Sequence, residues 1–286
     1  MTVPVTVVTG AARGMGLACA HRLYRPGEPL VLVDVDLAGI RRVAKGLGDG
    51  VVAYQCDVSD EAEVVGLAAR VQELGSFRAL AHAAGISPTM AEARRIFEVD
   101  LVGTQLLLAA FEDLVGSGSA AVCFSSLAAY HLAPYATAEM DALIDDPLAP
   151  GFLDRAAEQF PDSGMAYGLA KRGVVRSVAR AAVRWGSRGG RVNSVAPGLI
   201  DTPMGRQELE QQSIMRTMLG QVPLARLGEA DEVAAVVAFL LSEDASFVSG
   251  VDVLSMERPC QAWPPPRLLV LEPSVGAAPG GVHAAR

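Results

Sequence analysis

The sequence predicts an α/β fold, a doubly wound and mostly parallel seven-stranded sheet with helices on both faces. Short β-branched runs alternate along the chain with longer Ala-rich stretches of helical period, which is the pattern of a parallel sheet wound with helices. The runs are apolar throughout, as expected when helices cover both faces of a sheet. The expected strands are Val3–Val8, Leu30–Val33, Val51–Tyr54, Ala79–His82, Ala120–Phe124, Arg191–Val195 and Val251–Leu254. The expected helices are Gly16–Tyr24, Glu61–Leu74, Ile96–Leu114, Ala166–Trp185 and Asp231–Leu241.

Two stretches interrupt this alternation. The connection over residues 130–164 is far longer than the few residues typical of such loops. Its apolar positions fall on two helical faces, first Met140, Leu143 and Ile144 and then Phe152, Ala156, Ala157 and Phe160. This pattern predicts two short helices that form a flap.

The second interruption is the C-terminal stretch, residues 255–286, which is rich in Pro and Gly. Such a composition resists regular packing, and its abrupt onset suggests an altered or frame-shifted C-terminus. We therefore expect one domain over residues 1–254, carrying a helical insertion at about 130–164 and followed by an atypical tail.

The composition excludes several classes of function. The 286 residues are 51% hydrophobic and carry a net charge of −8, which favours a large apolar core and argues against nucleic acid as a partner. No apolar run reaches the length of a membrane helix and no secretory signal opens the chain, so we expect a soluble cytoplasmic protein. The four cysteines and four histidines show no metal-ligand spacing, and we expect no metal site and reduced, structural thiols.

A glycine-rich turn follows the first expected strand and opens into a helix. Gly10, Gly14 and Gly16 lie in the stretch Thr9-Gly10-Ala11-Ala12-Arg13-Gly14-Met15-Gly16. Glycines at this place allow a tight turn and let the backbone approach a pyrophosphate, whose charge is met by amides at the helix N-terminus. The turn predicts a dinucleotide site of the Rossmann type.

Asp34, at the end of the second expected strand, strengthens this interpretation. A carboxylate about 20 residues after the glycines can accept hydrogen bonds from both hydroxyls of an adenosine ribose. It would repel a 2′-phosphate, so NAD is favoured over NADP. Arg13 keeps NADP open as an alternative, because a guanidinium can pair with such a phosphate.

A second group of polar residues follows the fifth expected strand. Tyr167 and Lys171 are four residues apart on one expected helix and share a face. A nearby ammonium can lower the pKa of a phenol, which can then exchange a proton with the oxygen of a reacting carbon. Ser126, at the end of the fifth strand, is expected to hold that oxygen by a hydrogen bond.

With the glycine turn, Asp34, Ser126 and the Tyr–Lys pair in this order, the chain resembles the short-chain dehydrogenase/reductase family over about Val3 to Leu254. The resemblance implies that Tyr167 is the acid/base, that Lys171 binds ribose and lowers the Tyr pKa, and that Ser126 positions the substrate. The residues that it implies for cofactor binding are Gly10, Arg13, Gly14, Met15, Gly16, Asp34, Asp57, Val58, Ala84, Gly85, Tyr167, Lys171, Pro197, Gly198, Ile200 and Thr202.

Besides its atypical C-terminal stretch, the chain departs from this family's pattern at two places. Asp100 occupies the position at which most members have an Asn that anchors a proton-relay water; its charge puts the relay in doubt. The long insertion between Ser126 and Tyr167 is similar to that of the bacterial 3α-hydroxysteroid dehydrogenase/carbonyl reductase branch. We expect the insertion to form a lid over the pocket or to cover a surface that relatives use to oligomerise. Members are commonly oligomers, so a homodimer or homotetramer is expected.

These features together predict an NAD-dependent enzyme that interconverts a secondary alcohol and a ketone, with a small, steroid-like molecule as the expected substrate. The alternative is a catalytically weak dinucleotide-binding sensor or scaffold protein, which Asp100 and the atypical tail motivate.

Overall fold

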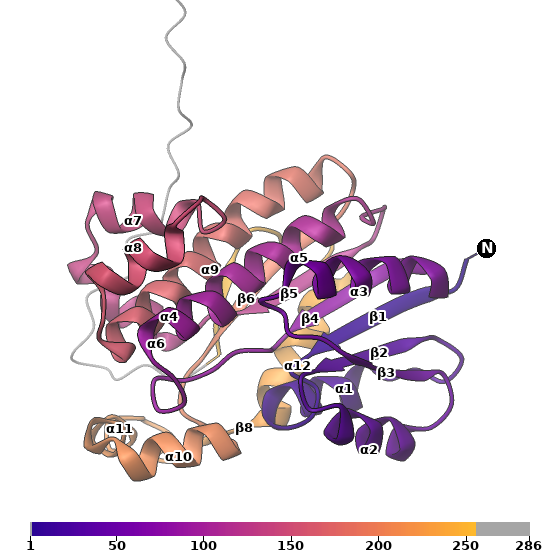
Figure 1. The fold of residues 1–286 in the computed structure, drawn as a ribbon. Coiled ribbons are helices and arrows are strands. Elements are labelled where there is room, and N and C mark those ends of the chain that lie inside the picture. The colour runs from indigo at the N-terminus through magenta and orange to yellow at the C-terminus, as the bar shows by residue number, and fades with distance from the viewer. Residues whose placement is uncertain (1, 256–286) are drawn as a thin grey trace, which may run out of the picture.

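A seven-stranded parallel sheet forms the centre of the protein (Figure 1), whose computed structural model describes residues 2–255. Its strand order is β3-β2-β1-β4-β5-β6-β9, and all neighbouring strands are parallel. The strands are β1 (Pro4–Thr9), β2 (Leu30–Asp34), β3 (Val51–Gln55), β4 (Ser76–His82), β5 (Ala120–Phe124), β6 (Arg191–Pro197) and β9 (Asp252–Ser255). The predicted fold class is confirmed. The strand order reverses between β1 and β4, which places a crevice beyond their carboxyl ends.

Helices cover both faces of this sheet (Figure 1). One layer consists of α3 (Glu61–Leu74), α5 (Gly103–Glu112) and α9 (Ser163–Gly186); the other consists of α1 (Gly14–Leu23), α2 (Leu37–Leu47) and α12 (Ala230–Leu241). Successive side chains of β1 face the two helix layers alternately, because side chains point to opposite sides along a strand. Val7 belongs to the buried cluster under α3, α5 and α9, whereas Val8 belongs to the cluster under α1 and α12.

The structure adds elements that the sequence interpretation lacked. The helix expected over 96–114 begins earlier as α4 (Ala93–Ile96), continues as a π-helix, η1 (Phe97–Val102), and then becomes α5. The other elements without a counterpart in the prediction are α2, α6 (Leu127–Leu132), η2 (Ala133–Tyr135), β7 (Ile200–Asp201), α10 (Pro203–Gln211), α11 (Ser213–Leu219), β8 (Gly228–Glu229) and η3 (Glu243–Ala245).

The insertion does contain the two expected short helices, α7 (Ala138–Asp145) and α8 (Phe152–Gln159). They pack beside α4 and α9 (Figure 1) and contribute to a third buried cluster. Ile144 and Ala156 are fully buried in it, and the Phe152 ring meets Phe97 edge to face with centroids 5.9 Å apart. The insertion is therefore fixed by its own core contacts along α9.

Ion pairs reinforce the contact between α7 and α9. Asp141 accepts hydrogen bonds from Arg172 Nε at 2.6 Å and from Arg176 Nη1 at 3.1 Å. Asp145 pairs with Arg176 and Arg180. These arginines recur at intervals of four along α9, so one face of that helix meets the acidic residues of α7. The helix α7 thus covers part of one face of α9.

Two acidic residues near the protein surface have defined partners. Asp145 pairs with the arginines of α9, and Asp36 caps α2 by accepting a hydrogen bond from the Gly39 amide at 2.8 Å. A capping carboxylate satisfies an amide that the first helical turn leaves free. Asp36 thus marks the start of α2, one of the helices that the sequence interpretation overlooked.

The structural role expected of the cysteines is confirmed for Cys19, Cys56 and Cys123, which are buried free thiols; burial raises their pKa values to about 12. Cys260 and the Pro/Gly-rich tail lie outside the described residues. None of the helices between residues 2 and 255 combines the length and the apolar character that a membrane span requires.

Candidate active site

The turn between β1 and α1 is built on close backbone approaches. Gly10 has a φ of +66°, and a Cβ placed on it would lie 2.7 Å from the amide nitrogen of Ala84, in the loop after β4. A Cβ on Gly16 would lie 2.1 Å from the carbonyl oxygen of Gly10. Gly14 has a φ of +56°, which favours glycine. The helix α1 begins after Arg13 without a side-chain cap, so its N-terminal amides remain available to an anion.

Asp34 lies at the end of β2, beside this turn. Its Oδ2 accepts a hydrogen bond from the Ala12 amide at 3.1 Å, and its Oδ1 accepts one from the Asp36 amide at 3.0 Å. Each carboxylate oxygen can accept more than one hydrogen bond. The carboxylate is therefore fixed in orientation and retains acceptor capacity for the hydroxyls of a ribose.

The side chain of Asp57, which is among the expected cofactor-binding residues, is engaged within the protein. Its Oδ1 accepts hydrogen bonds from the amide and hydroxyl of Ser59, and its Oδ2 accepts one from Arg95 at 2.6 Å. Burial acts to raise the pKa of Asp57, but these hydrogen bonds outweigh it and hold the pKa below its ordinary value. The neighbouring Val58 is buried against Gly103.

Lys171 is the buried cation of the site. Its ammonium donates a hydrogen bond to the carbonyl oxygen of Phe124 at 3.1 Å and lies 3.5 Å from Asp100 Oδ1. Gly85 leaves room for this pair, because a Cβ there would come within 2.7 Å of Asp100 Oδ1. The amide of Ile86 donates to the same oxygen at 3.0 Å. Four segments of the chain are therefore joined around one ammonium.

Asp100 is on the π-helix η1 and is fully enclosed. Burial raises the pKa of Asp100, although Lys171 and the Ile86 amide oppose this effect. Its Oδ2 has no hydrogen-bond partner within residues 2–255. A π-helix often marks a functional position. Here it brings the carboxylate of Asp100 to Lys171, at the position where the family resemblance implied an Asn side chain.

A chain of buried hydrogen bonds connects Asp100 with the glycine turn. Thr104 donates to the Asp100 carbonyl oxygen at 2.7 Å, and His82 lies between Thr104 (3.0 Å from Nε2) and Thr9 (2.8 Å from Nδ1). Since Thr104 is a donor to Asp100, it accepts from His82 Nε2–H, and Thr9 donates to Nδ1. Burial lowers the pKa of His82 to about 3. His82 is thus neutral and has a structural role.

Tyr167 has a higher pKa than the sequence led us to expect. Burial raises the pKa of Tyr167 above its ordinary value of 10.0 and the charge of Asp100 raises it further, whereas a hydrogen bond with Ser126 lowers it. The Lys171 ammonium lies 5.6 Å from the centre of the Tyr167 ring. The pKa shift is therefore opposite in direction to the one predicted, chiefly because the phenol is buried and also because the charge of Asp100 adds to the effect.

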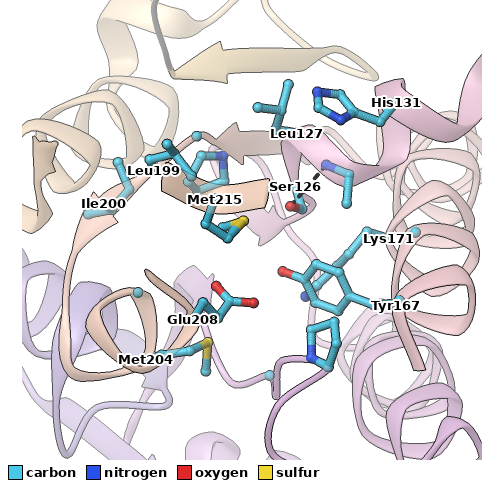
Figure 2. A pocket seen from close by; sticks show the side chains of 18 of the residues that line it. Ser126, Leu127, His131, Tyr167, Lys171, Leu199, Ile200, Met204, Glu208 and Met215 are labelled. Atoms are coloured by element: carbon cyan, nitrogen blue, oxygen red, sulfur yellow. Dashed lines mark hydrogen bonds between the residues drawn. The ribbon is translucent and has the colours of Figure 1, made fainter. Parts of the chain in front are cut away.

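The two serines after β5 have different roles. Ser125 is buried, with its hydroxyl 2.9 Å from the Val195 carbonyl oxygen and 2.8 Å from Asp252 Oδ1. Ser126 lines a pocket and accepts a hydrogen bond from the Ala128 amide at 3.2 Å (Figure 2). Because Ser126 accepts there, its hydroxyl hydrogen is available for the Tyr167 oxygen or for a group bound in the pocket.

This pocket has a volume of about 470 Å³ and is mostly apolar. Five of the protein's nine methionines line it, which favours an adaptable surface for an apolar ligand. Of the expected site residues, those that line it are Met15, Gly85, Ser126, Tyr167, Lys171, Pro197, Gly198, Ile200 and Thr202. Gly10, Arg13, Gly14, Gly16, Asp34, Asp57, Val58, Ala84 and Asp100 are not among its lining residues.

The walls of the pocket also include residues that the sequence interpretation missed. These are Met204 and Glu208 of α10, which line the pocket together with His131 of α6 (Figure 2). The only signal for α10 was its position after the Pro197–Thr202 turn. The insertion reaches this pocket through His131, Leu132, Tyr135 and Gly164, whereas no residue of α7 or α8 lines it. A lid formed by the insertion therefore stays a prediction, and its two short helices are not part of the pocket wall. Between residues 2 and 255, no cluster of His, Cys, Asp or Glu could hold a metal ion.

Comparisons with known proteins agree with this geometry. The sequence model of a family described as enoyl-(acyl carrier protein) reductase matches residues 10–142 and 153–255. The short-chain dehydrogenase/reductase bsc3 of Alternaria brassicicola is 34% identical over 257 residues, which cover 87% of this chain and 93% of that protein. The meso-2,3-butanediol dehydrogenase of Serratia marcescens is 32% identical over 262 residues, covering 87% and 91%.

The fold is also similar to that of a solved dehydrogenase structure. The 3-alpha-hydroxysteroid dehydrogenase from Pseudomonas sp. B-0831, complexed with NADH, superposes with a TM-score of 0.70 and 26% identity, covering 88% of this chain and 94% of that one. The family model thus matches most of the chain, and both named relatives are more than 30% identical to it over most of their own length. The chain therefore belongs to the short-chain dehydrogenase/reductase family of oxidoreductases.

Proposed function

We propose that this protein interconverts a secondary alcohol and a ketone with a nicotinamide dinucleotide, using Tyr167 as the acid/base. The observation that carries the proposal is the lining of one pocket by Ser126, Tyr167 and Lys171, at the carboxyl ends of the strands next to the glycine turn. The name of the butanediol dehydrogenase supports the alcohol chemistry.

The residues of the turn fit a dinucleotide. The close contact of Gly10 with Ala84 and the uncapped start of α1 suit a pyrophosphate, and Asp34 suits the adenosine ribose. Lys171 and Tyr167 would hold the ribose next to the nicotinamide, and the turn over Pro197–Thr202 would hold the nicotinamide itself. When bound, the dinucleotide supplies or accepts the hydride.

The protein's own groups handle the proton. In the reducing direction, Tyr167 donates its hydroxyl proton to the carbonyl oxygen, and Ser126 donates a hydrogen bond to the same oxygen. Lys171, fixed by Phe124 and Asp100, holds a positive charge near the phenol. The apolar walls of the pocket keep water away from the reacting carbon.

The apolar, methionine-rich pocket supports a bulky apolar ketone, steroid-like in size, as substrate. Membership of the 3α-hydroxysteroid dehydrogenase/carbonyl reductase branch is part of this proposal; the insertion and the similarity to the Pseudomonas structure support it. The alternative of a catalytically weak dinucleotide-binding sensor or scaffold is favoured by one observation, the raised pKa of Tyr167.

Replacing Tyr167 with Phe distinguishes the two functions. Because the proton donor is lost, Tyr167→Phe should lower ketone reduction, followed by NADH absorbance, by about 10²-fold or more. NADH binding, measured by calorimetry, should be retained. Tyr24→Phe is the matched control, since that hydroxyl contacts Asp49 away from the pocket. Undiminished turnover in Tyr167→Phe would rule out the acid/base role.

The preference for NAD over NADP depends on Asp34. Asp34→Ala should weaken NADH binding and lower the ratio of NADH to NADPH affinity by about tenfold or more, since the ribose loses charge-assisted hydrogen bonds and the repulsion of a 2′-phosphate disappears. Calorimetry with both dinucleotides measures the ratio. The exposed Asp49→Asn serves as control. An unaltered ratio of the two affinities in Asp34→Ala would show that Asp34 does not set the preference for NAD.

Asp100 should set the pH at which reduction declines. The reducing direction needs protonated Tyr167, so activity falls as the pH rises through the Tyr pKa. Because the charge of Asp100 raises that pKa, Asp100→Asn should move the decline in kcat/KM to lower pH, by about one unit or more. Asp113→Asn, on the surface, is the control. A decline at the same or higher pH in Asp100→Asn would show that Asp100 does not act on Tyr167.

We also infer a homodimer or homotetramer. Phe239 of α12, Phe247 and Val251 are exposed apolar side chains close in sequence to the edge strand β9, and such side chains mark interfaces when they cluster. Multi-angle light scattering should give a mass of two or four chains for the full-length protein. A mass of one chain over the working concentration range would refute the inference.

A further inference from the structure

Glu208 is an acidic side chain directed into an otherwise apolar part of the pocket. Met204 and Glu208 are four residues apart on α10, and both point toward the space in front of Tyr167 (Figure 2). Arg206, a cation on the same helix, is engaged elsewhere, with its Nε 2.5 Å from Asp201 Oδ1. Arg206 therefore does not pair with Glu208, whose carboxylate faces the pocket.

No hydrogen-bond or ion-pair partner of the Glu208 carboxylate occurs within residues 2–255, and the pocket offers few candidates. Its other titratable lining residues are His131, Tyr135, Tyr167 and Lys171. Lys171, the one cation among them at neutral pH, is occupied by Phe124 and Asp100. Burial raises the pKa of Glu208 from its ordinary 4.5 to about 7, which agrees with a carboxylate that is poorly hydrated and unpaired.

A ligand that fills the pocket removes much of the remaining water from Glu208. A carboxylate without a partner in an apolar environment costs several kcal/mol, so an apolar ligand group facing it is unfavourable. A group that donates a hydrogen bond offsets this cost. A second carboxylate adds repulsion between like charges.

We propose that Glu208 selects substrates that carry a hydrogen-bond donor, a hydroxyl or an ammonium group, remote from the reacting carbon, and that it disfavours substrates with a carboxylate there. This inference rests on the proposed alcohol–ketone function. It narrows the substrate to an apolar-bodied ketone or alcohol with a second, neutral or cationic polar end.

The test, run above the pKa of Glu208 so that its side chain is a carboxylate, compares methyl ketones of one chain length that end in methyl, hydroxyl, ammonium or carboxylate. The wild type should reduce at least one donor-ended ketone with a kcat/KM about tenfold or more above that of the methyl-ended ketone, and the carboxylate-ended ketone least well. Glu208→Leu should lose this preference while it still reduces the methyl-ended ketone. The matched control is Glu210→Gln, an exposed acid on the same helix.

A second variant separates the two donors and guards against misfolding of the first. Glu208→Gln can still accept a hydrogen bond but has no charge, so it should keep a preference for hydroxyl and lose one for ammonium. An equal ratio of donor-ended to methyl-ended kcat/KM in the wild type and in Glu208→Leu would overturn the inference, as would a wild-type preference for carboxylate. Reduction of all four ketones without preference would leave the proposed function intact and refute only the role of Glu208. No reduction of any ketone would refute both.

Discussion

The burial of one ammonium group, that of Lys171, organises the site. An ammonium removed from water is unstable unless it has hydrogen-bond and charge partners, and the chain supplies them from β5 through the Phe124 carbonyl and from η1 through Asp100. The loop after β4 completes the arrangement, because the Ile86 amide holds Asp100 and Gly85 leaves space for both groups. The position of Tyr167, one helical turn before Lys171, follows from these contacts.

The glycine turn and the Lys171 cluster belong to one connected structure. The close approach of Gly10 to Ala84 joins the turn to the loop after β4, and the hydrogen bonds of His82 join Thr9 to Thr104 and so to Asp100. A neutral histidine suits this role, since it donates through one nitrogen and accepts through the other. Buried contacts thus hold the glycine turn and the Lys171 cluster at a fixed distance from each other.

The sequence predicted those parts of the structure that local patterns determine. Uniformly apolar runs indicated the parallel sheet, glycines indicated the turn at Gly10, and helical spacing of apolar residues indicated α7 and α8. It did not predict the partners of Asp100 or the raised pKa of Tyr167, because these depend on contacts between segments far apart in the chain. Glu208 was missed for a related reason: α10 has a polar sequence, and only the tertiary structure shows which of its acids faces the pocket.

Transfer of deuterium tests the central claim most directly. The full-length protein is incubated with a methyl ketone and NADH that is deuterated at both C4 positions, and the alcohol produced is analysed by mass spectrometry. If Tyr167 and Lys171 serve a reaction at the carbonyl, the alcohol carries deuterium on its carbinol carbon. The account would be contradicted if NADH binds but no alcohol forms from any ketone of the series, or if the alcohol formed carries no deuterium at that carbon.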